Sequence, residues 1–204
     1  MDQNPVRVWG DIYSGNCYKI KLALKQLCWP YEWNHVNILE GESRTPAFLA
    51  MNSNGRVPIL ETAEGVVLAE TNAILHYVAD DSVLLPTDRL LHAQVLQWMF
   101  FEQYSHEPYI ATARYIVRYL GRPANREETL QQKMAPGYAA LAVMESHLQS
   151  RSFFVGEQYT IADIALYAYT HVAHEGGFDL IGYPALHAWL ARVKNEPRHV
   201  AMDG

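Results

Sequence analysis

The sequence is poor in cysteine and contains no long hydrophobic segment. Of its 204 residues, Cys17 and Cys28 are the two cysteines, too few for a disulfide framework. A bond between them is not expected, because they fall near opposite ends of one predicted helix and bridged Cα atoms lie within roughly 7 Å. No run of about 18 apolar residues and no basic, apolar signal peptide occurs, so we expect no membrane association. We therefore expect a cytoplasmic protein, since the cytoplasm is a reducing compartment.

The sequence also lacks an excess of basic residues. It has 16 Lys and Arg against 22 Asp and Glu, a formal net charge of −6. Because nucleic-acid-binding surfaces are normally basic, we expect no nucleic-acid partner. Nine histidines are present, but the i, i+3 pair His171 and His174 is a weak indication of a ligand set, so no metal is expected. Hydrophobic residues make up 50% of the chain, which is enough for a sizeable core.

Residues 1–80 are expected to form a small α/β domain. The first two strands flank a helix, and such a crossover favours parallel pairing. Thr71 is expected to cap the last helix of this domain, which starts at residue 73. The strands are expected at residues 6–9, 31–36, 56–60 and 66–68.

The pattern changes after an expected linker at residues 81–88. Few strand signals remain, and we expect residues 89–204 to form an all-helical domain. Thr160 and Asp163 match a capping box at the start of a buried helix. The helical spacing covers residues 90–120, 127–148, 161–173 and 185–193.

A polar loop from Ser14 to Cys17 joins the first strand to the first helix. Ser14 or Asn16 can cap that helix by accepting from its backbone N–H groups. A helix N-terminus carries partial positive charge and favours an anion such as a thiolate. Cys17 is interpreted either as a small buried thiol or, if exposed, as a reactive thiol whose pKa the helix lowers. Three lysines of this helix are expected to form a solvated face: Lys19, Lys21 and Lys25.

Four short motifs resemble the cytosolic glutathione transferase family, across essentially the whole chain. They are the loop and helix start at 14–19, Arg56-Val57-Pro58, the Glu-Thr-Asn-Ala-Ile segment at 70–74, and the helix start at 156–163. The resemblance implies a thioredoxin-like α/β N-terminal domain that binds glutathione, followed by an all-α helical bundle that shapes the pocket for an electrophile. It also implies a homodimer, with glutathione as a co-substrate and no permanently bound cofactor.

The loop resembles several classes of this family. Theta-like enzymes place a catalytic serine where Ser14 falls. Nu-like bacterial enzymes have a Thr-x-Asn pair in the place of Ser14 and Asn16, followed by a lysine like Lys19. Beta-class enzymes have a cysteine in the place of Cys17. The resemblance therefore implies a glutathione S-transferase that stabilises the thiolate for attack on a small apolar electrophile. A glutathione-dependent peroxide or disulfide reductase, a thiol transferase and a non-catalytic binding protein of this fold are the alternatives.

The resemblance also implies contacts for each part of glutathione. The backbone of Val57, before Pro58, would pair with the cysteinyl unit as an added strand does. Glu70 and Thr71 would hold the γ-glutamyl end at a helix start. Ser43 and Arg56 are the candidates for the glycine carboxylate, with Arg56 preferred over Ser43 and Arg44. The electrophile pocket is expected to be lined by Phe101, Tyr104, His106, Tyr109 and Arg114, although core packing explains each of these residues equally well.

Overall fold

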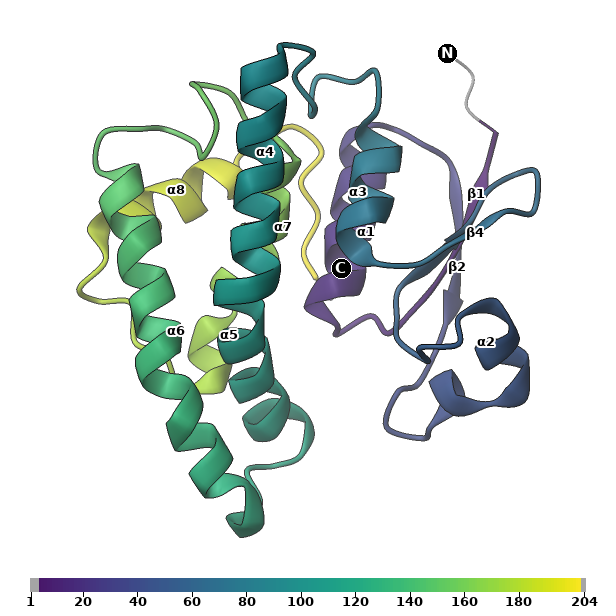
Figure 1. Ribbon diagram of the computed structural model, residues 1–204, viewed down its shortest axis with the longest axis horizontal. Coiled ribbons are helices and arrows are strands. Elements are labelled where there is room, and N and C mark those ends of the chain that lie inside the picture. The colour runs from purple at the N-terminus through teal and green to yellow at the C-terminus, as the bar shows by residue number, and fades with distance from the viewer. Residues whose placement is uncertain (1–3, 203–204) are drawn as a thin grey trace. The chain divides into compact units, whose positions relative to one another are not determined.

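The N-terminal half of the chain is built on a four-stranded mixed sheet (Figure 1). The computed structural model describes residues 4–202. The strands are β1 (Val6–Gly10), β2 (Tyr31–His35), β3 (Ile59–Glu61) and β4 (Val67–Leu68), in the order β2-β1-β3-β4. β1 and β2 are parallel, as predicted from the crossover helix, and the other two pairs are antiparallel.

Helices cover the sheet because both of its faces are apolar. α1 (Gly15–Gln26) and α3 (Thr71–Ala79) pack against each other. On the opposite face Trp9 and Ile59 join a small cluster with Phe48 of α2 (Pro46–Met51). A 3-10 turn, η1 (Glu42–Arg44), precedes α2. This layered α/β arrangement confirms the predicted thioredoxin-like class.

The second half is helical within the described residues. Its elements are α4 (Arg89–Phe101), the π-helical turn η2 (Glu102–His106), α5 (Glu107–Arg114), the π-helical turn η3 (Tyr115–Tyr119), the 3-10 turn η4 (Ala124–Arg126), α6 (Glu127–Leu148), α7 (Ile161–Thr170), the 3-10 turn η5 (Ala173–Gly176) and α8 (Pro184–Lys194). All ten residues of α7 are buried, so this helix is the centre of the bundle. The predicted capping box at Thr160 and Asp163 is confirmed.

Several boundaries differ from the sequence-based expectations. The expected helix 90–120 is divided by the two π-helical turns, and Pro108 lies in the first turn of α5, where its missing N–H costs nothing. The helix expected from residue 73 begins at Thr71, so Thr71 is not its cap. Glu70 is the N-cap, and its carbonyl oxygen accepts the first helical bond from the Ile74 N–H at 2.9 Å.

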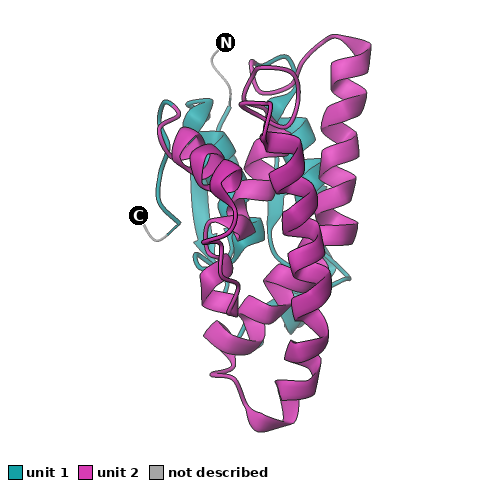
Figure 2. Cartoon of the chain, turned by 90° about the vertical axis from the view of Figure 1, so that its left-hand side faces the viewer, with its two compact units in different colours: residues 1–82, 197–204 teal, residues 83–196 magenta. Residues whose placement is uncertain are grey.

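The chain forms two compact units (Figure 2). One is Val83–Glu196, and the other combines the described residues up to Ser82 with those from Pro197 onward. The end of the chain had been expected in the helical domain. It belongs instead with the sheet, because the Tyr18 hydroxyl of α1 donates to the Val200 carbonyl oxygen at 2.7 Å.

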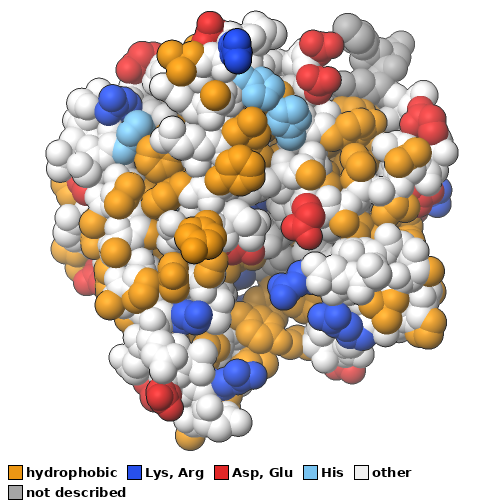
Figure 3. All heavy atoms as spheres, viewed as in Figure 1, with side chains coloured by type: hydrophobic (Ala, Val, Ile, Leu, Met, Phe, Trp, Pro, Cys, Tyr) orange, Lys and Arg blue, Asp and Glu red, His pale blue; other side chains and the backbone are white. Residues whose placement is uncertain are grey.

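The surface of the helical unit carries several large hydrophobic side chains, and Figure 3 shows hydrophobic groups spread over the face turned to the viewer. On α4 the residues Leu90, Ala93, Gln97 and Phe100 are exposed at spacings of three and four, which places them on one side of the helix. Among residues 4–202, no helix is long and apolar enough to cross a membrane.

Candidate functional site

The strand register brings three of the predicted segments to one end of the sheet. β3 runs antiparallel to β1, with Ile59 opposite Trp9. The start of β3, just after Pro58, therefore lies where β1 finishes. β4 runs antiparallel to β3, with Leu68 opposite Leu60, so the chain leaves β4 and enters α3 at this same end. We call it the loop end of the sheet: the end of β1, the start of β3 and the starts of α1 and α3.

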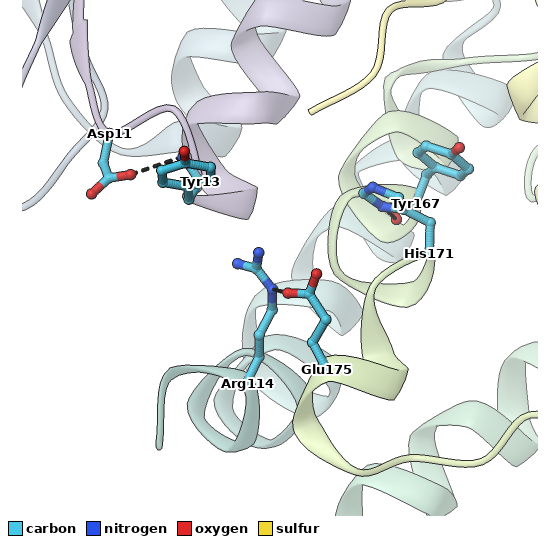
Figure 4. Close-up of polar contacts among 6 residues, drawn as sticks. All are labelled: Asp11, Tyr13, Arg114, Tyr167, His171 and Glu175. Atoms are coloured by element: carbon cyan, nitrogen blue, oxygen red, sulfur yellow. Dashed lines mark hydrogen bonds and ion pairs between the residues drawn. The ribbon is translucent and has the colours of Figure 1, made fainter. Parts of the chain in front are cut away.

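The loop after β1 is held by short-range hydrogen bonds. The Asp11 carbonyl oxygen accepts from the Ser14 N–H at 3.1 Å, and its carboxylate oxygen Oδ1 accepts from the Tyr13 N–H at 2.8 Å (Figure 4). Ser14 has an extended backbone and is the N-cap of α1, and its Oγ accepts from the Cys17 N–H at 3.4 Å. A serine hydroxyl that accepts at a cap still has a proton to donate. Capping and thiolate binding are therefore compatible roles for Ser14.

Cys17 is fully buried at the first turn of α1. A Cβ atom added to Gly10 would lie 2.7 Å from the Cys17 sulfur, so this thiol packs directly against the end of β1. Burial raises the pKa of Cys17 to about 12, and the hydrogen bond with Ser14 offsets only part of that shift. At neutral pH Cys17 is therefore a neutral thiol, which does not support its use as an exposed nucleophile.

Asn16 and Lys19 form a polar pair on the first turns of α1. The Lys19 ammonium Nζ donates to the Asn16 side-chain oxygen Oδ1 at 2.8 Å. Lys19 is fully buried, so its placement on a solvated helix face was wrong. Most sides of α1 are buried. Lysines spaced two and four residues apart in the sequence do not show which of them is buried. Lys25 is exposed as predicted and lies 5.4 Å from the ring centroid of Tyr31.

The segment before β3 has the predicted cis peptide bond between Val57 and Pro58. Pro58 is buried, and Val57 is half-buried against the cluster that includes Phe48. This pair lies at the loop end of the sheet, as the register requires.

The start of α3 adds a second helix N-terminus to the loop end of the sheet. Glu70 is exposed and has a φ of 68°, a left-handed backbone conformation that is costly for a residue with a Cβ. Thr71, the first residue of the helix, is buried. Two helix N-termini therefore meet the same edge, and each carries partial positive charge.

Two arginines near this edge, Arg44 and Arg56, differ in the contacts that their side chains make. Arg44 donates to the Asn54 carbonyl oxygen at 3.0 Å, and its guanidinium covers Gly55 so closely that an added Cβ would lie 2.5 Å from it. Arg56 is exposed, while its own carbonyl oxygen accepts from Asn52 at 2.9 Å. Ser43 is buried in η1, which makes it less accessible to a ligand than Arg56.

The residues expected to line an electrophile pocket do not share one environment. Phe101 packs edge-on against Trp98, with ring centroids 5.2 Å apart. Tyr104 is 84% exposed, whereas His106 is fully buried and its Nε2 lies 2.9 Å from the Thr170 hydroxyl. Both residues belong to the π-helical turn η2, and residues two positions apart do not share one side of a helix, which accounts for the difference between them.

Tyr109 is half-buried beneath the Lys133 ammonium, which lies 5.5 Å from its ring centroid. Arg114 is buried, and its Nε forms an ion pair with Glu175 at 2.6 Å (Figure 4). Figure 4 also shows the Tyr167 and His171 rings, which stack with centroids 4.6 Å apart. Among residues 4–202, no group of three or more His, Cys, Asp or Glu side chains is arranged to hold a metal ion.

The sequence analysis did not single out Asp11, and it expected Lys19 to be solvated. Asp11 is a buried acid in the loop itself, and Lys19 is a buried base one turn into α1. An aspartate directly after a β-strand that enters a polar loop was the available signal for Asp11. The spacing of the lysines does not distinguish Lys19 from Lys25, and the nu-like pattern, which has a lysine like Lys19, was the available signal.

Two descriptions of one protein family match the chain, one in each half. The family description "Glutathione S-transferase, N-terminal domain" matches residues 4–80, and "Glutathione S-transferase, C-terminal domain" matches residues 91–197. The crystal structure of a glutathione S-transferase from Pseudomonas fluorescens has 57% sequence identity and a TM-score of 0.95, covering 97% of this chain and 98% of that one. Ure2p in complex with glutathione shares the fold at 23% identity, with a TM-score of 0.84 and 97% coverage of both chains.

A different kind of relative is elongation factor 1-gamma-A from Xenopus laevis. It is 35% identical over 167 residues, which is 79% of this chain and 37% of that protein. The chain spans between 28% and 37% of the length of the first four elongation factor 1-gamma relatives. Both family matches cover nearly all of the described residues, in the order that the two units follow. This chain belongs to the glutathione S-transferase family.

Proposed function

We propose that this protein is a glutathione transferase that holds glutathione at the loop end of the sheet and stabilises its thiolate for attack on a small apolar electrophile. The observation that carries the proposal is the convergence fixed by the strand register. The N-terminus of α1, the Val57–Pro58 backbone and the N-terminus of α3 all meet at one edge. Glutathione offers a thiol, an extended backbone and an α-carboxylate, one for each of these features.

Ser14 is the proposed donor to the sulfur. A free thiol has a pKa of about 8.5, so little thiolate exists at neutral pH. Each unit of lowering requires about 1.4 kcal/mol of preference for the anion. A hydroxyl donor and a helix N-terminus together supply roughly two units. Ser14 occupies the cap of α1, so both contributions act at one place.

The γ-glutamyl end is assigned to the start of α3. The Thr71 hydroxyl and backbone N–H would bind the α-carboxylate, and the Glu70 carboxylate would bind the α-ammonium. The costly φ of Glu70 supports this assignment, because strained residues persist where function requires their direction. Arg56 is proposed for the glycine carboxylate, since Arg44 is already engaged by Asn54.

For the electrophile we propose an apolar wall that includes Phe101 and Tyr109. The full burial of His106 supports a role for it in the bundle core, with Thr170 as its partner. We also propose a cytoplasmic location, because that compartment keeps glutathione reduced.

A homodimer is proposed from the family resemblance and from the exposed side of α4. Leu90 is 66% exposed and Phe100 is 69% exposed, and both lie on the same side of that helix. Large exposed apolar groups on one helix side are typical of subunit interfaces.

A non-catalytic role is the second candidate, because elongation factor 1-gamma proteins are among the relatives. A non-catalytic protein needs no site that stabilises a thiolate, whereas a transferase does. The two candidate functions therefore differ in whether the protein activates the thiol of glutathione. A glutathione-dependent reductase would use the same loop residues, Ser14 and Asn16, as the proposed transferase. A thiol transferase that uses Cys17 is disfavoured by the burial of this thiol and its raised pKa.

The test is calorimetric titration of the purified protein with reduced glutathione and with glutathione disulfide, with Cys17→Ser as a parallel variant. Tight binding of the reduced form that is unchanged in Cys17→Ser supports the proposed transferase. Preference for the disulfide would support the reductase. Absence of binding by both forms would support the non-catalytic role.

A further inference from the structure

The loop between α2 and β3 carries Arg56 and Val57, and one residue, Asn52, binds it at three points. The Asn52 side-chain oxygen Oδ1 accepts from the Asn54 N–H at 3.1 Å. The Asn52 backbone carbonyl oxygen accepts from the Gly55 N–H at 2.8 Å. The side-chain nitrogen Nδ2 of Asn52 donates to the Arg56 carbonyl oxygen at 2.9 Å. Asn52 therefore holds the loop up to the residue before Val57.

Asn52 is itself fixed in place. Its N–H donates to the Phe48 carbonyl oxygen at 2.9 Å, at the end of α2. The two ends of its side-chain amide cannot be exchanged, because a backbone N–H only donates and a carbonyl only accepts. Arg44 adds a further contact, since its Nη1 donates to the Asn54 carbonyl oxygen at 3.0 Å. The loop is thus bound by two side chains from outside it.

The bond from Asn52 to Arg56 determines the direction of the Val57 N–H. The Arg56 carbonyl and the Val57 N–H belong to one trans peptide unit. In a trans peptide unit these two groups point in opposite directions. Because the Arg56 carbonyl oxygen is turned toward Asn52, the Val57 N–H points away from Asn52. Among the described residues, no backbone carbonyl oxygen accepts from this N–H.

We propose that Asn52 is a positioning residue for glutathione. By holding the Arg56 carbonyl oxygen, it presents the Val57 N–H as a donor to the backbone of the cysteinyl unit. This inference rests on the proposed function, in which the Val57 backbone pairs with that unit. An added strand binds through main-chain hydrogen bonds, so the direction of each N–H at the edge affects its affinity. An N–H that is already directed correctly does not have to be ordered on binding.

The experiment is calorimetric titration of the full-length protein and its Asn52→Asp variant with reduced glutathione. An ionised aspartate keeps the size of the side chain and still accepts from Asn54, but it cannot donate to the Arg56 carbonyl. We expect the dissociation constant to rise about tenfold, the effect of losing one oriented hydrogen bond. Asn54→Asp is the matched control for the added charge. Asn54 is exposed and is bound through its backbone, so this variant should bind as wild type does.

Two further measurements separate positioning from a general loosening of the unit. At saturating glutathione, the thiol pKa in Asn52→Asp should equal that in wild type, because Ser14 lies on a different element. A loosened unit would raise this pKa as well. In protein with isotope-labelled valine, glutathione should shift the Val57 amide proton resonance downfield in wild type, as expected for a new hydrogen bond. The shift should be smaller in Asn52→Asp at saturation.

Equal dissociation constants for wild type and Asn52→Asp, an equal loss of affinity in Asn54→Asp, or a raised thiol pKa in Asn52→Asp alone would overturn the inference. If Asn52→Asp does not fold, the wild-type spectrum decides, and a Val57 resonance that does not move when glutathione binds would overturn it. In each of these cases a wild type that binds glutathione and lowers its thiol pKa leaves the proposed function standing. If wild type does not bind reduced glutathione, the proposed function fails, and the inference fails with it.

Discussion

Gly10 and Cys17 show how a single atom shapes the site. Strand β1 ends at Gly10, and the absence of a side chain there lets the Cys17 sulfur and the Trp33 ring pack against the backbone. An added Cβ would lie 2.7 Å from the sulfur and 3.1 Å from the ring. The first turn of α1 is therefore held close to the strand, which fixes where its N-terminus lies.

We predict that Gly10→Ala lowers the free energy of unfolding by about 1–3 kcal/mol, the usual cost of overpacking a core. Urea denaturation measures this change. Gly10→Ala/Cys17→Ala should recover part of the loss, because it removes the sulfur but not Trp33. Equal stability of Gly10→Ala and wild type would show that the contact relaxes without cost.

Glu70 combines an unfavourable backbone with a proposed ligand contact, and two substitutions separate these effects. Both Glu70→Gly and Glu70→Ala remove the carboxylate, but only glycine relieves the φ of 68°. We predict that Glu70→Gly is more stable than Glu70→Ala by about 1 kcal/mol. Both should weaken glutathione binding about tenfold, the loss of one charged hydrogen bond. Thermal unfolding and calorimetry test the two parts, and equal melting temperatures would argue against strain at Glu70.

At this scale the sequence predicted residue types better than their environments. A serine before a helix with free N–H groups is recognisable from local chemistry, and Ser14 is indeed the cap. Lys19 is buried because of the residues that pack around α1 in the folded protein. The residues next to it in the sequence do not indicate this burial.

The start of α7 is held by the side chain of Asp163. Asp163 is fully buried and accepts hydrogen bonds from the Phe154 N–H, the Thr160 N–H and the Trp189 ring N–H, at 2.9 to 3.1 Å. It thereby joins the loop before α7, the cap of α7 and a ring of α8. Burial raises the pKa of Asp163 to about 6, against an ordinary value of 3.8.

We predict that Asp163→Asn lowers the free energy of unfolding by about 2–4 kcal/mol, because an amide nitrogen must face N–H donors. The difference in the free energy of unfolding between wild type and Asp163→Asn should depend on pH. Between about pH 4 and pH 6 the folded protein binds the Asp163 proton more tightly than the unfolded chain does. The contribution of Asp163 to stability therefore falls as the pH rises through this window, by at most about 3 kcal/mol.

Urea denaturation of both proteins at pH 4 and at pH 6.5 measures this dependence. The gap in stability between wild type and Asp163→Asn should narrow as the pH rises. A gap that widens would mean that the hydrogen bonds hold the pKa of Asp163 below its ordinary value.

The limits of a helix were predictable where residues close in sequence determine them. The limits of α6 at 127–148 and the capping box of α7 follow from helical periodicity and from side chains that bond to nearby backbone. The π-helical turns at 102–106 and 115–119 were not predictable. Such a turn inserts a residue into a helix, and no local signal in the sequence marks where it occurs.

For the whole molecule, the division into an α/β unit and a helical unit follows from the change of pattern near residue 80. The placement of the last described residues did not follow from it. The Tyr18 hydroxyl binds the Val200 carbonyl oxygen, and the Lys21 ammonium donates to the Met202 carbonyl oxygen at 3.2 Å. Contacts over about 180 residues of sequence depend on the tertiary fold, which periodicity does not describe.

The proposed homodimer is a prediction at this same scale. Phe100→Glu places a charge on the exposed side of α4 and should convert the dimer to monomer, because a charge buried in an interface without a partner is costly. Light scattering coupled to size exclusion measures the mass. Ile181→Glu is the control, since Ile181 is 85% exposed in the same unit but lies outside α4. Equal masses for wild type and Phe100→Glu would contradict an interface at this side.

The central claim is that Ser14, at the cap of α1, stabilises the thiolate of bound glutathione. The most direct test is the pKa of that thiol, read from thiolate absorbance in wild type, Ser14→Ala and Ser14→Thr. We predict a pKa about two units below the free value in wild type, a rise of about one unit in Ser14→Ala, and recovery in Ser14→Thr, which keeps the hydroxyl. Identical titrations of wild type and Ser14→Ala would contradict the claim.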